Sequence, residues 1–216
     1  MNTPDSSSIQ RKTSDRVAAE QPLRPDLALI ASWIAPGSQV LDLGCGDGVL
    51  LDHLQRHKGC SGYGVEIADA QVLACARRGV DVIQQNIEAG LGMFSANRFD
   101  VVVLSMAIQA TKNTEQVLRE MSQIGTTGIV SFPNFGHWSH AWSILRGRMP
   151  VSSEMPYQWY DTPNLHLATP LDFEELIAQL GLKVTQRALL ANGKPVGWLA
   201  AQRATQAIYR FCARPA

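Results

Sequence analysis

The stretch VLDLGCGDG, residues Val40–Gly48, joins an apolar run, a carboxylate and three glycines at alternate positions. The apolar run favours a buried strand, and the helical pattern of VLLDHLQRH, which follows at once, places the glycines at a turn from strand to helix. Glycines at this spacing permit a sharp turn and let a ligand approach the backbone closely. We therefore predict a ligand-binding loop at residues 44–48, with a glycine-rich turn that holds no ligand as the alternative.

Seven apolar runs rich in β-branched residues are typical of strands. They are QVLDL, GYGVEI, VDVIQQ, FDVVVLS, GIVSFP, LKVTQRALL and AIYRFCARP. The first five alternate with helical segments, which predicts an α/β fold with a mostly parallel seven-stranded sheet and helices on both faces. The last two are joined by a connection with Gly and Pro and predict a long hairpin, so an antiparallel strand is expected near the C-terminus.

Two helices outside this repeat are also predicted. Residues 26–34, DLALIASWI, have apolar residues at helical spacing and are followed by the turn signal Pro36-Gly37. The segment TPLDFEELIAQLG has Thr169 at the N-cap, Asp172 at the capping-box position and Gly181 after the helix end.

Length and composition indicate one domain with no net charge to attract nucleic acid or anionic lipid. The chain has 216 residues, and its 19 Lys and Arg balance 19 Asp and Glu, so we expect neither nucleic-acid nor membrane binding. Four scattered cysteines suggest reduced thiols and no metal site, and no run is apolar enough for a signal peptide or membrane span. We expect a cytoplasmic protein with a flexible tail at 1–21 and a single domain at 22–216.

The glycine spacing also bears on the kind of ligand. Dinucleotide folds use G-x-G-x-x-G, whereas GCGDGV has Val49 at the sixth position and reads G-x-G-x-G. Asp42 is expected at the strand end, where a carboxylate repels a pyrophosphate but suits a cationic group. S-adenosylmethionine carries such groups, an ammonium and a sulfonium. Asp42 can alternatively cap the loop by accepting from its amides.

The ends of the next two predicted strands offer partners for a nucleoside. Glu66 lies at the end of GYGVEI, where a carboxylate can accept from both ribose hydroxyls, in NAD and S-adenosylmethionine alike. Asn86 and Ile87 follow VDVIQQ and are placed to border an adenine ring. The plainer readings are a solvated strand-end carboxylate for Glu66 and a turn residue for Asn86.

At this point the chain resembles the class I S-adenosylmethionine-dependent methyltransferases, because DLGCGDG followed by GVEI matches their first two motifs. The resemblance implies their Rossmann-like fold and S-adenosylmethionine, or S-adenosylhomocysteine, as cofactor. Asn86 replaces the Asp that is more usual beside the adenine. The implied cofactor-binding residues are Asp42, Gly44, Cys45, Gly46, Gly48, Glu66, Ile67, Asn86 and Ile87.

A narrower resemblance is carried by LSMAIQATKN, VSFPNFGHW, GRMPV and PYQWYDTPNLHLATPLDFEEL. Together with the glycine loop, these segments are similar to the methionine biosynthesis protein MetW family over about residues 23–190. The resemblance implies association with homoserine O-acyltransferase in methionine biosynthesis, and it names no methyl acceptor.

An aromatic-rich insertion is predicted at residues 133–168. Seven of the fifteen aromatics fall between Phe132 and Tyr160. Trp138 and Trp142, at i and i+4, would form the buried face of a short helix if the segment were a satellite core. Two alternatives to a satellite core remain. The segment is either a lid over the glycine loop or a surface that binds a partner, since aromatic residues and Arg are favoured at interfaces.

The sequence marks no catalytic group. A methyltransferase that deprotonates its acceptor needs a base, and His137, Tyr157, Asp161 and His166 are the candidates, although we interpret His166 as a buried residue that holds the insertion to the sheet. Three functions remain: a cofactor-binding partner of the acyltransferase, an active small-molecule methyltransferase and, more remotely, a nicotinamide-dependent oxidoreductase.

Overall fold

The computed structural model describes residues 22–213, so the flexible tail predicted at residues 1–21 lies outside the described part. One sheet runs through the molecule in the order β3-β2-β1-β4-β5-β8-β6-β7. Its strands are β1 (Gln39–Leu43), β2 (Ser61–Glu66), β3 (Val82–Gln84), β4 (Phe99–Ser105), β5 (Gly125–Pro133), β6 (Leu182–Ala191), β7 (Lys194–Pro195) and β8 (Gln206–Ala213). The pairs among β1 to β5 are parallel, and β8 runs antiparallel between β5 and β6, as the sequence predicts.

The sheet has eight strands, so the predicted number of seven is wrong. The additional strand is β7, a two-residue strand that pairs with the end of β6. Asn192 and Gly193 join the two strands and both have positive φ, +50° and +73°, as a type I′ hairpin turn requires. The apolar pattern of the sequence did not predict β7, because a strand of two residues is too short to show such a pattern.

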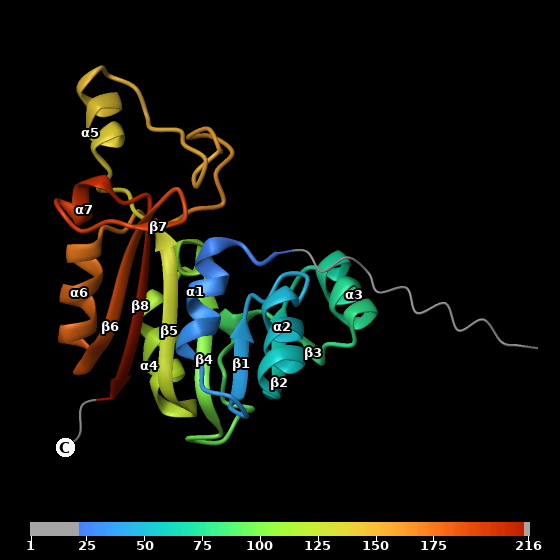
Figure 1. Ribbon diagram of the computed structural model, residues 1–216. Coiled ribbons are helices and arrows are strands. Elements are labelled where there is room, and N and C mark those ends of the chain that lie inside the picture. The colour runs from blue at the N-terminus through green and yellow to red at the C-terminus, as the bar shows by residue number, and fades with distance from the viewer. Residues whose placement is uncertain (1–21, 214–216) are drawn as a thin grey trace, which may run out of the picture.

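Helices cover both faces of the sheet (Figure 1). They are α1 (Pro25–Trp33), α2 (Val49–Lys58), α3 (Asp69–Arg78), α4 (Thr114–Ile124), α5 (Trp138–Leu145), α6 (Pro170–Gln179) and α7 (Ala200–Arg203). Buried residues of α1, α2 and α3 form one core cluster, and those of α4 and α6 form the other. The alternation along β1 divides its side chains between the two cores: Leu41 and Leu43 face α4 and α6, and Val40 faces the opposite side.

The ends of the predicted C-terminal helix follow their sequence signals. The Thr169 hydroxyl accepts from the backbone N–H of Asp172 at 3.3 Å and donates to its carboxylate at 2.6 Å, and Gly181 has a φ of +72° just beyond the helix. The predicted helix at residues 26–34 corresponds to α1. Among the helices of residues 22–213, none has the length and apolarity to cross a membrane.

The aromatic insertion, residues 133–168, projects from the edge where β5 ends, with α5 standing clear of the sheet (Figure 1). Its base is closed by hydrogen bonds. The Asn134 side-chain amide donates to the carbonyls of Ala201 and Ala204, both at 2.7 Å, and the backbone N–H of Phe135 donates to Ala168 at 3.0 Å. The projection is therefore fixed where it leaves and rejoins the sheet.

Candidate functional site

The glycine loop has the backbone geometry that its sequence predicts. Gly44, Gly46 and Gly48 have φ of +67°, +57° and +76°, a region that L-residues rarely adopt. A side chain at Gly44 would lie 3.2 Å from the Cβ of Ala107, so glycine lets the loop after β1 approach the segment after β4. Around Gly46 a Cβ would meet nothing within 4 Å. That open space leaves the backbone accessible to a ligand.

Glu66, the last residue of β2, organises the loop through backbone bonds. One carboxylate oxygen accepts from the N–H of Gly46 at 2.9 Å, and the other accepts from Ile67 at 2.8 Å and Ala68 at 3.0 Å. A carboxylate offers about four acceptor positions. Three of these positions are occupied by backbone amides, so one is left for a ligand hydroxyl. For Glu66 to accept from both ribose hydroxyls, one of the three amides would have to give up its bond.

A cavity of about 280 Å³ lies beside this carboxylate, between the ends of β2 and β3 and the segment after β4. Five predicted site residues line it: Gly44, Glu66, Ile67, Asn86 and Ile87. The side-chain Oδ1 of Asn86 accepts from the backbone N–H of Glu88 at 2.9 Å and caps a short 3₁₀ turn, so the side-chain NH₂ group is the part that remains for a ligand.

The remaining predicted residues support the cavity from behind. The Cys45 side chain is buried, with its sulfur 3.7 Å from that of Cys75, so Cys45 can meet a ligand only through its backbone. A Cβ at Gly48 would lie 3.0 Å from the Cys75 sulfur and 3.3 Å from Val80. Gly48 therefore serves close packing of the loop against α3.

Asp42 is buried in β1, two residues before Gly44, and does not line this cavity. Burial, reinforced by the nearby charge of Glu66 and opposed by that of Arg24, raises the pKa of Asp42 to about 7 from an ordinary value of 3.8. The loop amides do not depend on it, because Gly44 and Cys45 donate to the Val65 carbonyl and Gly46 donates to Glu66. Asp42 is thus a carboxylate whose charge a cationic ligand would stabilise.

This raised pKa predicts a pH dependence of stability. The native protein binds the Asp42 proton more tightly than the unfolded chain, so this contribution to stability is full below about pH 4 and is lost as the pH rises to about 7. We expect the free energy of unfolding of Asp42→Asn, relative to the wild type, to rise by up to about 4 kcal/mol across that window. Urea denaturation of both proteins from pH 4 to pH 8 measures it. A difference that is constant with pH would show that Asp42 titrates normally.

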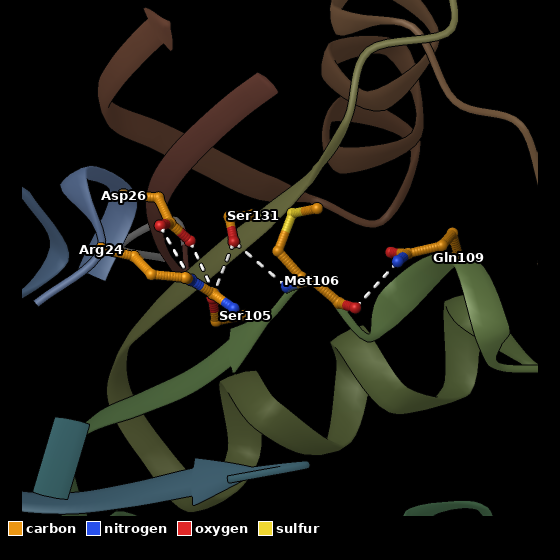
Figure 2. Close-up of polar contacts among 6 residues, drawn as sticks. All are labelled: Arg24, Asp26, Ser105, Met106, Gln109 and Ser131. Carbon is orange, nitrogen blue, oxygen red and sulfur yellow. Dashed lines mark hydrogen bonds and ion pairs between the residues drawn. The ribbon is translucent and has the colours of Figure 1, made fainter. Parts of the chain in front are cut away.

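Several cavity residues were not predicted as site residues. Met106, Ala107, Ala110 and Thr111 follow β4 and line the same cavity. Met106 has a φ of +53°, and its N–H donates to the Ser131 hydroxyl at 3.1 Å and to the Ser131 carbonyl at 2.9 Å (Figure 2). The only sequence signal was their position after a strand, because apolar and small residues carry no chemical mark of a site.

None of the four candidate bases lines the cavity within the described part of the chain. Tyr157 and Asp161 are exposed on the insertion. The interpretation of His166 as a buried residue is wrong, because its side chain is exposed, although its backbone N–H does tie the insertion to the Gln109 carbonyl at 3.0 Å. The pKa of His137 is lowered, mainly by burial and to a smaller extent by the neighbouring His140.

His140 was not considered from the sequence and is nevertheless buried at the base of α5. Its Nδ1 lies 3.1 Å from the Phe135 carbonyl oxygen and donates to it, because a carbonyl oxygen can only accept. Nε2 has no hydrogen-bond partner among residues 22–213. Across those residues, no group of three or more His, Cys, Asp and Glu is arranged for a metal ion.

The satellite-core alternative for the aromatic insertion is wrong. Trp138 and Trp142 are 60% and 50% exposed, and Trp159 and Tyr160 are 70% and 71% exposed. Arg146 stacks on the Trp142 ring at 4.8 Å. Other large apolar side chains are exposed on the same segment: Ile144, Leu145, Met149, Val151, Tyr157, Leu165 and Leu167.

Comparison with solved structures defines the class of protein. A crystal structure of an S-adenosylmethionine-dependent methyltransferase from Archaeoglobus fulgidus matches with a TM-score of 0.66 at 15% identity, over 87% of this chain and 91% of that one. The described residues therefore have the Rossmann-like fold of the class I methyltransferases, as predicted. At this identity the likeness concerns the fold alone.

The sequence narrows the class to one family. The model for methionine biosynthesis protein MetW matches residues 24–211, and the chain belongs to that family, which confirms the resemblance. The bifunctional methionine biosynthesis protein MetXA/MetW of Rhodopirellula baltica is 35% identical over 185 residues, 81% of this chain and 30% of that protein. Nocamycin O-methyltransferase of Saccharothrix syringae is 32% identical over 118 residues, 48% of this chain and 42% of that protein. The chain spans less than half the length of either relative.

Proposed function

We propose that this protein binds S-adenosylmethionine or S-adenosylhomocysteine at the glycine loop and acts as a partner of homoserine O-acyltransferase. The cofactor fits the residues present. Glu66 keeps one acceptor position for a ribose hydroxyl, Asn86 borders the cavity, and Asp42 is a buried carboxylate two residues before Gly44. A pyrophosphate fits poorly, because the Gly46 amide already donates to Glu66 and both nearby acidic groups would repel it.

The partner half of the proposal rests mainly on the exposed aromatic insertion. We treat residues 22–216 as one domain in which residues 133–168 form the docking surface. Contiguous exposed apolar side chains are unusual on a monomer and mark interaction surfaces, particularly where Trp, Tyr and Arg gather. The relative from Rhodopirellula baltica supports the choice of partner, because its name joins MetXA with MetW and this chain matches only 30% of it.

A second candidate, methyl transfer to a small molecule, is favoured by the partial match to nocamycin O-methyltransferase. His140 is the candidate base, since its Nε2 is buried and has no hydrogen-bond partner among residues 22–213. It lies at the base of the insertion and does not line the 280 Å³ cavity among the described residues. Turnover of labelled S-adenosylmethionine with small-metabolite acceptors would favour this candidate over the partner role.

The double variant Trp159→Ala/Tyr160→Ala tests the docking surface. Both rings are largely exposed and form an edge-to-face pair at 5.7 Å, so their loss should not destabilise the fold. We expect complex formation with purified homoserine O-acyltransferase to weaken by roughly 30-fold or more, as for interface hot spots. Sedimentation velocity of mixtures at several concentrations measures the affinity.

Leu73→Ala is the matched control, because Leu73 is also exposed, at 52%, but lies on α3 at the far end of the molecule from α5 (Figure 1). Its complex should have wild-type affinity. Equal affinity of the double variant and the wild type would rule out this surface. If the insertion is instead a lid, the double variant should lose affinity for S-adenosylmethionine in calorimetry, whereas a docking surface leaves that affinity unchanged.

A further inference from the structure

The connection between β4 and α4, residues 106–113, contributes to the walls of two cavities. Met106 and Ala107 line the 280 Å³ cavity beside the glycine loop. Ile108 and Gln109 line a second cavity of about 890 Å³, which is bordered by α4, by α6 and by the last residues of the insertion. A change in this connection therefore reaches both the candidate cofactor cavity and the end of the insertion.

Hydrogen bonds join the connection to both of its neighbours. On the insertion side, the backbone N–H groups of Leu165 and His166 donate to the Gln109 carbonyl oxygen at 2.8 and 3.0 Å. On the cofactor side, Glu88 lines the 280 Å³ cavity, and its Oε1 accepts from the backbone N–H groups of the two residues that precede α4. The connection is thus bonded to a residue of the cofactor cavity and to the returning end of the insertion.

Two local features raise the free energy of this arrangement. Met106 has a φ of +53°, in the left-handed region that a residue other than glycine adopts only at a cost. The Gln109 side chain donates from Nε2 to the Met106 carbonyl oxygen at 2.8 Å (Figure 2), but its Oε1 is buried and has no hydrogen-bond partner among the described residues. A buried acceptor without a partner is also unfavourable. Together they narrow the free-energy gap to an alternative arrangement of residues 106–109.

We propose that residues 106–109 are a two-state element that couples occupancy of the cofactor cavity to the conformation of the aromatic insertion. A ligand that packs against Met106 and Ala107 favours the strained arrangement, in which the Gln109 carbonyl holds the insertion. Without ligand, the strain favours the alternative and loosens that hold. The inference rests on the proposed function and deepens it, because it names the segment by which cofactor alters the docking surface.

The test follows amide hydrogen exchange in the full chain without a partner, with S-adenosylhomocysteine as the probe. In the wild type, saturating ligand should slow exchange of the Leu165 and His166 amides roughly 10-fold, because the liganded arrangement keeps both of their bonds to Gln109. Calorimetry on the same samples measures whether the ligand is bound.

Gln109→Met removes the side-chain bond to Met106 while it keeps the backbone carbonyl and a side chain of similar length. In this variant, ligand should change exchange of the Leu165 and His166 amides by less than about twofold, because the two ends of the segment are no longer joined. Gln179→Met is the matched control, since Gln179 is exposed on α6 and donates from Nε2 to Glu175 at 3.3 Å. It should keep the wild-type response.

Met106→Gly removes the backbone strain and tests the direction of the effect. Its Leu165 and His166 amides should exchange slowly even without ligand, because glycine adopts positive φ freely. A wild type that binds S-adenosylhomocysteine with no change at these amides would overturn the coupling alone, as would an equal response in Gln109→Met. A wild type that fails to bind S-adenosylhomocysteine in calorimetry would overturn the proposed cofactor binding together with it.

Discussion

Replacement of Gly46 by valine is expected to abolish binding of S-adenosylmethionine while the protein stays folded. Gly46 has a φ of +57°, which a β-branched residue adopts only under strain, and its N–H holds the carboxylate of Glu66. The valine side chain would also fill the open space beside the loop. Strain, loss of the Glu66 contact and occlusion act together, so we expect a loss of affinity of roughly 100-fold or more.

Gly37→Val is the control for this variant, because Gly37 has a φ of +75°, an equally open surrounding, and a place in the turn before β1 at the opposite edge of the sheet. Gly37→Val should have the same backbone strain as Gly46→Val and still bind S-adenosylmethionine with wild-type affinity. Calorimetry measures the affinity of the wild type, Gly46→Val and Gly37→Val for S-adenosylmethionine, S-adenosylhomocysteine and NAD. Normal binding by folded Gly46→Val, or a wild type that prefers NAD, would contradict the assignment of the loop.

Replacement of Gly62 by alanine is expected to prevent folding. Gly62 lies in β2 with a φ of +152°, and a Cβ there would lie 1.7 Å from the carbonyl oxygen of Val40 and 2.7 Å from its carbonyl carbon. The obstacle is backbone in a central strand, so no side-chain movement relieves it. Because β1 also carries Asp42 and leads into the glycine loop, the fold and the site should be lost together.

We expect Gly62→Ala to lower the free energy of unfolding by more than about 4 kcal/mol, at the upper end for single substitutions. Urea denaturation followed by circular dichroism measures it. Gly197→Ala is the matched control, because a Cβ there meets nothing within 4 Å and its φ is not in the left-handed region. A Gly62→Ala protein with the wild-type unfolding midpoint would show that the close β1–β2 contact is absent in solution.

Most of the fold is predictable from local patterns in the sequence. Parallel strands buried on both faces are continuous apolar runs, and the helix of residues 170–179 has explicit signals at both ends. The missed strand β7 has only two residues and no apolar pattern, but the Asn192-Gly193 pair was a usable hairpin signal. Patterns thus predict elements with a buried face and miss those defined by a turn alone.

The candidate site is predictable only where chemistry needs a particular residue type. Left-handed backbone requires glycine, so the loop at residues 44–48 was apparent from sequence alone. Met106 and Ala107 line the cavity because the sheet order places β4 beside β1, and the segment after β4 therefore lies next to the glycine loop. The exposure of Trp138 and Trp142 was equally unpredictable, because i and i+4 aromatics look alike on a buried face and on a docking face.

We propose above all that this chain is a cofactor-binding partner of homoserine O-acyltransferase. The most direct measurement is the acyl-transfer rate of the purified acyltransferase with and without this chain, over a range of S-adenosylmethionine concentrations, together with the amount of complex in the same samples. We predict a stable complex, an altered rate, and a complex affinity that shifts with cofactor, because ligand binding and partner binding are then linked. Absence of a complex together with an unchanged rate at every cofactor concentration would rule out this partner role.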